Sequence, residues 1–245
     1  MTDVEDDRPS VSVIIPTFNE EQWIGDTLAA LANVKGEIEI ILADGGSHDR
    51  TTEIARDLGA KVVTSERGRG IQMHKGARAA RGETLLFLHA DTIAPPSLFE
   101  QIDEALTRGA TIIGGSCAIR FDGESRPARF MTWLYPKLAK LGLCYGDSGI
   151  FVRAHIYDEI GGFKQYPLFE DLDLIQRLKK KGRMIRVPVE IVTSSRRFEG
   201  CSFALTFARW SILQILYSFG VSPHTLNEFY APSRRAKRQG RPIRR

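Results

Sequence analysis

The chain has 245 residues, of which 42% are hydrophobic and 26% are charged, and these values are close to those of ordinary globular proteins. They exclude a disordered or fibrous chain, and the length fits one α/β domain with a sizeable core. The formal net charge of +4 is a property of one end, because residues 233–245 carry seven arginines and lysines and no acids, which leaves −3 for the other residues. The body has no basic stripe interleaved with aromatic residues, so we predict no nucleic-acid binding.

The cysteines and the N-terminus bear on the cellular compartment. Cys117, Cys144 and Cys201 are too few and too scattered for a disulfide framework or a zinc site. Residues 1–9 are acidic and lack the basic start and apolar stretch of a signal peptide. We therefore expect a flexible N-terminus, free thiols and a cytoplasmic protein.

Apolar strands and amphipathic helices alternate in the first part of the chain. The predicted strands are 11–15, 37–43, 61–64 and 84–89, and the predicted helices are 24–31, 49–58 and 70–80. Each strand is a continuous apolar run, which indicates that both faces of the sheet are buried. This pattern predicts an α/β fold of Rossmann-like type, with a mostly parallel central sheet flanked by helices.

The second part of the chain is less regular. Its predicted helices are 95–106, 126–143 with an interruption at Pro136, and 171–181, and its predicted strands are 111–121, 148–152 and 184–193 around Pro188. A strongly apolar helix is predicted over 202–219, but Arg209 lies near its middle, where a bilayer would make it costly. We expect a core or interfacial helix, which with the basic tail would permit peripheral contact with the inner face of the membrane.

Polar clusters follow three of the predicted strands. They are Pro16–Glu20, Asp44–Asp49 and His89–Thr92. Helix capping explains Asn19, Ser47 and Asp49, but it does not explain Asp44, which precedes two glycines, or Asp91, which closes an apolar run. Ligands of parallel sheets bind beyond the carboxyl ends of the strands, so we expect these clusters to share one crevice.

Several carboxylates in one crevice repel one another unless a cation or hydrogen-bond donors lie among them. Asp44 could accept the imide N–H of uracil, and Asp91 is a hard oxygen ligand suited to Mg²⁺ or Mn²⁺ on a diphosphate. Arg67–Gln72 adds guanidinium groups at the start of a predicted helix, where anions are favoured. The sequence thus indicates a nucleoside diphosphate and a divalent metal ion.

A fourth acidic cluster begins the predicted helix that ends at Lys181. Acids at its start and lysines at its end complement the helix dipole, which by itself explains Glu170 and Asp171. An ionised Asp171 in a fixed position would also suit the activation of an acceptor hydroxyl.

Two further segments could contact the acceptor. Gly146 and Asp147 precede a predicted strand, and Arg196 and Arg197 follow another and could grip a diphosphate or an anionic acceptor. An ordinary turn and a solvated basic pair are the alternative interpretations.

The motifs Val13–Glu20, Asp44–Ser47, Asp91 and Glu170–Asp171, in this order, resemble the family-2 inverting glycosyltransferases of GT-A fold over residues 10–200. Among these, the chain looks most like a small bacterial branch associated with arsenosugar biosynthesis. The resemblance implies a nucleotide-sugar half at 10–95 and an acceptor half at 96–200. An apolar helical extension at 201–232 and a basic tail at 233–245 follow.

The resemblance also implies roles for individual residues. The nucleotide sugar would be bound by Pro16, Thr17, Asn19, Glu20, Asp44, Gly45, Arg69, Gln72 and Asp91. Asp91 matches the last acid of the family's D-x-D motif and would hold the metal, although His89 stands at the first acidic position. Asp171 would be the general base, with Glu170 beside it. The donor would be UDP-linked by default, and the acceptor a hydroxyl or a lipid-linked phosphate.

Three other classes remain as alternatives. A nucleotidyltransferase would have a glycine-rich basic loop after the first strand, where this chain has Pro16–Glu20. A non-catalytic nucleotide-sugar-binding module would not need Asp91 and Asp171. A dimerising or membrane-recruited scaffold would need only the C-terminal helix. The sequence makes no prediction of oligomeric state.

Overall fold

The computed structural model describes residues 9–140, 145–196 and 202–229. The basic tail, Arg197, Cys144 and Cys201 lie outside the described residues. The strands are β1 (Val11–Thr17), β2 (Ile38–Asp44), β3 (Lys61–Thr64), β4 (Thr84–Phe87), β5 (Thr92–Ile93), β6 (Ile112–Phe121), β7 (Ile150–Arg153) and β8 (Arg183–Thr193). The helices are α1 (Ile24–Ala32), α2 (Thr51–Asp57), α3 (Arg69–Arg78), α4 (Leu98–Thr107), α5 (Arg126–Lys140), the short 3₁₀ helix η1 (Gly146–Ser148), α6 (Ala154–Glu159), α7 (Glu170–Lys179), α8 (Phe203–Ser218) and α9 (Pro223–Phe229).

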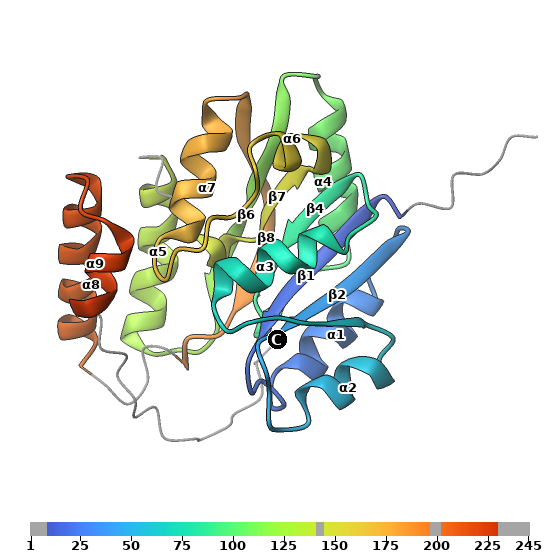
Figure 1. The fold of residues 1–245 in the computed structure, drawn as a ribbon, viewed down its shortest axis with the longest axis horizontal. Coiled ribbons are helices and arrows are strands. Elements are labelled where there is room, and N and C mark those ends of the chain that lie inside the picture. Colours follow the sequence, from blue (N-terminus) through green and yellow to red (C-terminus); the bar gives the residue numbers. More distant parts are fainter. Residues whose placement is uncertain (1–8, 141–144, 197–201, 230–245) are drawn as a thin grey trace, which may run out of the picture.

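The described strands form one eight-stranded sheet in the order β3-β2-β1-β4-β7-β6-β8-β5 (Figure 1). The pairs β1–β2, β1–β4, β2–β3 and β6–β8 are parallel, whereas β7 runs antiparallel to both of its neighbours and β5 antiparallel to β8. The predicted α/β class with a mostly parallel central sheet is confirmed. The carboxyl ends of β1, β2 and β4 meet at one edge, as such a sheet requires for a ligand site.

Both faces of the sheet are covered by helices, which explains the continuous apolar strands. Val13 and Ile15 pack on one side with apolar residues of α1 and α4, and Ile14 packs on the other with residues of α3 and α7. Successive side chains of a strand point to opposite faces, so apolar residues are favoured at consecutive positions.

β6 lies unusually close to its neighbours. A Cβ atom on Gly114 would lie 2.3 Å from the carbonyl oxygen of Phe151, and one on Gly115 would lie 2.2 Å from that of Ile185. These two positions therefore require glycine. The β6–β8 register shifts between Ser116 and Ala118, opposite the part of β8 that contains Pro188, where a missing N–H is tolerated.

The sequence prediction was wrong at Pro136 and incomplete elsewhere. α5 continues through Pro136 up to Lys140 rather than breaking there. Packing of Ala128, Met131 and Tyr135 against the end of β6 outweighs the hydrogen bond that proline removes. β5, η1 and α6 were not predicted, because each is too short for periodicity to reveal.

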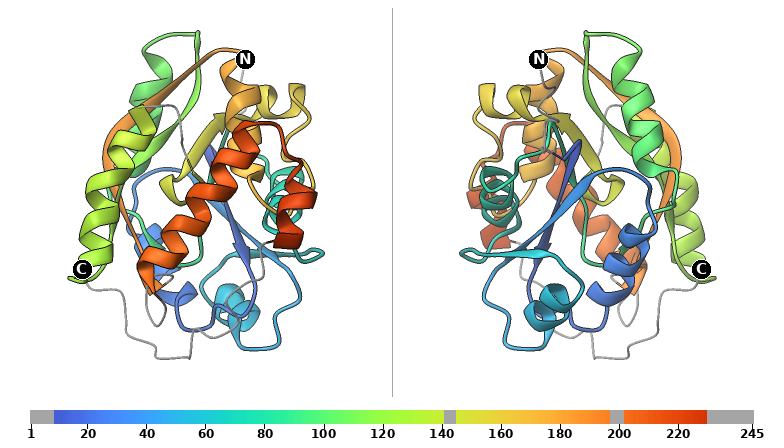
Figure 2. Two further views of the ribbon diagram at one scale, coloured as in Figure 1. Left: turned by 90° about the vertical axis from the view of Figure 1, so that its left-hand side faces the viewer. Right: turned by 90° about the vertical axis from the view of Figure 1, so that its right-hand side faces the viewer.

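α8 lies at one end of the molecule beside α5 (Figures 1 and 2). Phe203 and Phe207 contact Phe130 of α5 edge to face, and Leu213 is the one residue of α8 that is fully buried. α8 therefore packs one side against α5 and leaves most of its residues partly or fully exposed, so it is not a core helix. Among the described residues, no helix combines the length and apolar character needed to cross a bilayer.

Candidate functional site

The carboxyl ends of β1 and β4 border a cavity of about 420 Å³, which we call the first cavity. It is lined by Pro16, Thr17, Phe18, Glu20, Arg69, Gln72, His89, Ala90, Asp91, Phe121, Asp147, Thr193, Ser194 and Arg196. Most of the residues predicted to bind a nucleotide sugar are thus brought together. Asn19, Asp44 and Gly45 do not line this cavity.

Asp44 lies directly behind the cavity wall and fixes the loop after β2. Its carboxylate accepts hydrogen bonds from the Thr17 hydroxyl (3.2 Å), the Ser47 hydroxyl (2.5 Å) and the backbone N–H groups of Gly46 (3.0 Å) and Ser47 (2.8 Å). Thr17 and Asp44 are register partners at the ends of β1 and β2. These contacts give Asp44 a structural task besides its predicted contact with a base.

Asn19 and Gln72 also hold backbone in place. Asn19 accepts the N–H of His48 at 2.8 Å, and its own N–H donates to Ser47, so the loops after β1 and β2 are tied together. The Gln72 amide donates to the carbonyls of Thr17 (2.7 Å) and Ala43 (2.8 Å). Gln72 packs so closely on Gly45 that a Cβ there would approach its amide to 3.1 Å.

Arg196 lies in the first cavity. Its guanidinium donates to both oxygens of Glu20, at 2.7 and 2.9 Å, and its Nε lies 2.8 Å from Asp91 Oδ2. Arg196, which the sequence analysis named as a possible acceptor contact, thus lies at the edge of the sheet where β1 and β4 end, because β8 ends there too. Its predicted companion Arg197 lies outside the described residues.

His89, at the first position of the D-x-D-like segment, turns toward Asp147. Its Nδ1 lies 2.9 Å from Asp147 Oδ1, and the Tyr135 hydroxyl donates to Asp147 Oδ2 at 2.9 Å. β4, η1 and α5 are therefore joined at one carboxylate. His89 thus makes a polar contact with Asp147 of η1.

A second cavity, of about 300 Å³, adjoins the first and is far more apolar. Its lining comprises Arg69, Met131, Tyr135, Leu138, Tyr145, Asp147, Leu168, Phe169, Asp171, Phe207, Trp210, Ser211, Leu213, Gln214 and Ile215. Arg69 and Asp147 line both cavities, so the two are contiguous. Asp171 lies in the second cavity, and α5 and α8 supply most of the apolar wall.

Asp171 is held by backbone N–H groups in the first turn of α7. Its Oδ2 accepts from Gly146 at 2.6 Å and its Oδ1 from Leu172 at 2.8 Å. Burial and the neighbouring charge of Glu170 nevertheless raise the pKa of Asp171 to about 6, although Arg69 and the two N–H groups oppose the shift. The raised pKa makes Asp171 a stronger base than an ordinary aspartate.

Glu170 does not reach the cavity wall. It is 2% exposed and forms a 2.8 Å ion pair with Arg69 at the start of α3. A Cβ on Gly70 would lie 2.7 Å from the Lys164 carbonyl and 3.2 Å from Glu170, so Gly70 permits the close approach of α3 to α7. Glu170 therefore positions Arg69 between the two cavities.

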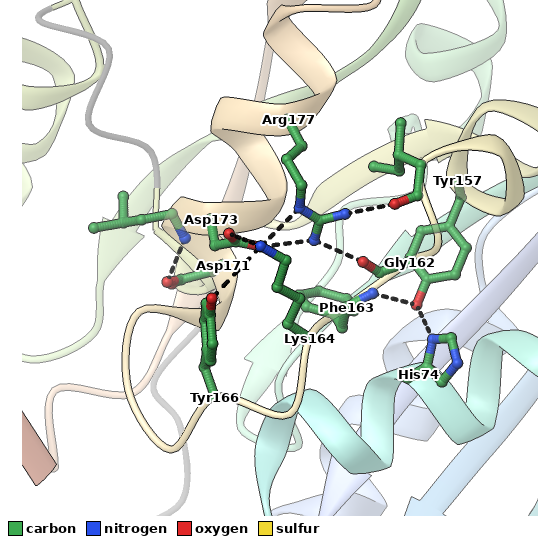
Figure 3. A network of polar contacts seen from close by, with 11 residues as sticks. His74, Tyr157, Gly162, Phe163, Lys164, Tyr166, Asp171, Asp173 and Arg177 are labelled. Carbon is green, nitrogen blue, oxygen red and sulfur yellow. Dashed lines mark hydrogen bonds and ion pairs between the residues drawn. The ribbon is translucent and has the colours of Figure 1, made fainter. Parts of the chain in front are cut away.

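The third acid of α7 belongs to a separate network. Figure 3 shows Asp173 with Lys164 and Arg177, whose side chains lie 3.2 and 2.7 Å from its carboxylate. Arg177 also donates to the carbonyls of Ile160 and Gly162. Asp173 thus anchors the chain segment that precedes α7, and it does not line either cavity.

The place of α8 in a cavity wall was not predicted from the sequence. The signal was present, because Phe207, Trp210, Ser211 and Gln214 follow helical i, i+3, i+4, i+7 spacing. Phe169 was also missed. It adopts a left-handed conformation (φ 59°) and stacks on Tyr217 of α8 with ring centres 4.8 Å apart.

A family model described as glycosyl transferase family 2 matches residues 12–158. The chain is 30% identical over 159 residues to the undecaprenyl-phosphate 4-deoxy-4-formamido-L-arabinose transferase of Edwardsiella ictaluri, covering 59% of this chain and 48% of the relative. It is 32% identical over 163 residues to the dolichol-phosphate mannosyltransferase of Pyrococcus furiosus, covering 62% and 45%. The chain spans about half the length of the curated relatives it matches.

Solved structures share the fold. The glucosyl-3-phosphoglycerate synthase of Mycobacterium tuberculosis, in complex with Mn²⁺, UDP-glucose and phosphoglyceric acid, matches with a TM-score of 0.62 and 21% identity, covering 87% of this chain and 80% of that chain. Residues 1–349 of S. aureus TarS, in complex with UDP-GlcNAc, match with a TM-score of 0.58 and 17% identity, covering 80% and 60%. The predicted GT-A type of fold is confirmed.

Proposed function

The chain belongs to glycosyl transferase family 2, and on that premise we propose that it moves a sugar, with inversion, from a nucleoside diphosphate sugar to a hydroxyl of an acceptor with an apolar chain. The observation that carries this proposal is the pair of contiguous cavities. One lies at the sheet edge and is lined by several charged side chains, the other is more apolar, and Arg69 and Asp147 line both.

The first cavity suits the donor. Arg69 and Arg196 line it and supply guanidinium groups for a diphosphate. Pro16, Thr17 and Phe18 at the end of β1 provide a surface for the nucleoside. The structural neighbours that were crystallised with UDP-glucose and UDP-GlcNAc support a nucleotide sugar as the ligand class.

The second cavity suits an acceptor with an apolar part. Met131, Leu138 and Trp210 are among its lining residues, and Ile215 both lines it and is 54% exposed, so the apolar wall continues to the surface. The named relatives transfer sugars to undecaprenyl phosphate and dolichol phosphate. A lipid carrier, presented by a membrane in contact with the exposed apolar face of α8, would fit this arrangement.

The charges near Asp171 favour a hydroxyl over a phosphate as the attacking group. Asp171 and Asp147 both line the second cavity, and Arg69, the one arginine that lines it within the described ranges, is paired with Glu170. The net negative charge there would repel a phosphate dianion but would not repel a neutral hydroxyl. A hydroxyl, unlike a phosphate, also requires a base.

In the proposed reaction, Asp171 accepts the proton of the acceptor hydroxyl while the oxygen attacks the anomeric carbon. The bond from that carbon to the diphosphate breaks on the opposite face, and the electron pair leaves with the nucleoside diphosphate. Arg69 and Arg196 stabilise the charge that develops on the departing diphosphate. A single displacement inverts the anomeric configuration.

The side chains of the first cavity form a poor set of ligands for the predicted divalent metal ion. Three carboxylates line the first cavity among the described residues: Glu20 and Asp91, which are paired with Arg196, and Asp147, which is bound by His89 and Tyr135. His89 is turned to Asp147. Within the described parts of the chain, no three His, Cys, Asp or Glu side chains cluster as a metal site. Mn²⁺ accompanies a structural neighbour, but we assign no step of this reaction to a metal.

A binding and transfer assay tests the function. A panel of UDP- and GDP-sugars should raise the melting temperature of the full chain, because ligands of the native state stabilise it. With the matching donor, release of nucleoside diphosphate should require a polyprenol or another long-chain alcohol, and polyprenyl phosphate serves as the comparison. Preference for the phosphate would contradict the hydroxyl acceptor. Exchange of pyrophosphate into the donor would indicate a nucleotidyltransferase instead.

The rate should depend on pH through Asp171. Only the ionised carboxylate accepts a proton, and its pKa is raised to about 6 by burial and by Glu170. Turnover should therefore fall about tenfold per pH unit below about pH 6 and level off above about pH 7. Initial rates at saturating donor, measured after a stability check at each pH, provide the profile. A turnover that stays constant down to about pH 5 would contradict the assignment.

A further inference from the structure

Arg196 joins two acidic side chains of the first cavity. Its Nη1 and Nη2 donate to the two oxygens of Glu20 at 2.7 and 2.9 Å, and its Nε forms an ion pair with Asp91 Oδ2 at 2.8 Å. Glu20 follows β1, Asp91 follows β4 and Arg196 follows β8, so one guanidinium connects three segments that are distant in the sequence. The Cζ atom of Arg196 also lies 5.3 Å from the centroid of the Trp23 ring, and this cation–π contact adds further support.

The guanidinium occupies the place that a cation between two carboxylates would take. Two carboxylates this close to one another repel unless a positive charge lies between them. Burial disfavours the charge on Arg196, but Glu20 and Asp91 outweigh this and raise the pKa of Arg196 above its ordinary value. The protein therefore supplies its own permanent cation at this point of the first cavity.

We propose that Arg196 takes the place of a divalent metal ion in holding the donor diphosphate, so that donor binding requires no metal. The proposal rests on the nucleotide-sugar function proposed above. A guanidinium has five N–H groups, and within the described residues three of them bind Glu20 and Asp91. One N–H on each Nη is left, and Arg196 lines the cavity and is 37% exposed. Two N–H groups in a fixed plane match phosphate oxygens.

Glu20 and Asp91 then act as positioning residues, because they orient the guanidinium rather than ligate a metal. A distinctive consequence follows for a variant without the arginine. Its two carboxylates would face each other without a cation, so the variant should bind a divalent ion that the natural chain does not need.

Nucleotide titration of the full-length chain tests this without any substitution. Calorimetric titration with UDP and with GDP, in excess EDTA and again in excess Mn²⁺, should give dissociation constants within about twofold of each other. Mn²⁺ titrated alone and followed by electron paramagnetic resonance should show no bound ion. A tightening of nucleotide binding by about tenfold or more on adding Mn²⁺ would overturn the proposal.

The variant Arg196→Gln supplies the second arm. In EDTA it should bind the nucleotide about 10–100-fold more weakly, as expected for loss of hydrogen bonds to a charged group, and Mn²⁺ should recover part of that loss. Arg120→Gln is the matched control, because Arg120 pairs with Glu190, both side chains are exposed, and Arg120 lines neither cavity. Arg196→Lys keeps the charge, so its affinity for the nucleotide in EDTA should lie between those of the natural chain and Arg196→Gln.

The outcomes separate this proposal from the function on which it rests. The role of Arg196 would be contradicted if Arg196→Gln bound the nucleotide in EDTA as tightly as the natural chain, or if the natural chain required a metal for binding. Either result would leave the proposed function standing. If the natural chain binds no nucleoside diphosphate in either condition, the proposed function fails and this inference falls with it.

Discussion

Replacing Asp171 by asparagine should lower the turnover number by a factor of about 100 or more and leave donor affinity within about twofold. Asparagine cannot accept the proton of the acceptor hydroxyl, while the first cavity, where the donor would lie, does not contain Asp171. Turnover under saturating donor and acceptor, together with calorimetric binding of the nucleotide, separates the two effects.

The matched control is Asp173→Asn, two residues further along α7. Asp173 is also acidic and largely buried, but it binds Lys164 and Arg177 and lines neither cavity (Figure 3). Its replacement should reduce stability and change turnover per folded molecule by less than about threefold. A near-normal turnover for Asp171→Asn, or an equal loss in both variants, would remove Asp171 as the base.

Asparagine at position 171 carries a structural cost that must be measured. Both oxygens of Asp171 accept backbone N–H groups, one from Gly146 and one from Leu172, and asparagine has a single acceptor oxygen. One of these two backbone N–H groups would then face the NH₂ group of the asparagine. Thermal unfolding and retained nucleotide binding show whether the variant is folded at the assay temperature, so that lost turnover can be attributed to lost chemistry.

The layered sheet and the donor edge could be predicted from the sequence because their signals are local. Apolar runs such as Val11–Ile15 indicate strands, and the polar clusters after them identify the functional edge of a parallel sheet. What these local signals left open is which residues of a cluster reach the cavity. Asn19 and Asp44 fix loops behind the cavity wall, whereas their neighbour Glu20 lines it.

The rest of the site depends on contacts between distant segments, which no single-sequence pattern reveals. Arg196 meets Glu20 across 176 positions of the chain, so its assignment to the acceptor side rested only on its place after the last strand. The second cavity forms where α8 packs against α5. The apolar sequence of α8 predicts a helix but does not indicate which element it packs against. The reversed directions of β7 and β5 arise from tertiary packing in the same way.

Removing the charge of Arg69 should have the second large effect, because Arg69 lines both cavities and pairs with Glu170. In Arg69→Met, kcat/KM should fall by a factor of about 100 or more, since a guanidinium that stabilises the leaving diphosphate is lost. The free energy of unfolding should also fall, by roughly 2–3 kcal/mol, because Glu170 is left buried without its partner. This loss is below that of a fully buried pair, because Arg69 is 40% exposed.

The double variant Arg69→Met with Glu170→Gln distinguishes the two tasks of Arg69. Removing both charges eliminates the unpaired buried carboxylate, so most of the lost stability should return. The catalytic loss should remain, because no side chain replaces the guanidinium between the cavities. Denaturant unfolding and kcat/KM are measured for both single variants and for the double variant. If activity recovers together with stability, Arg69 acts only through the fold, and its contact with the departing diphosphate is excluded.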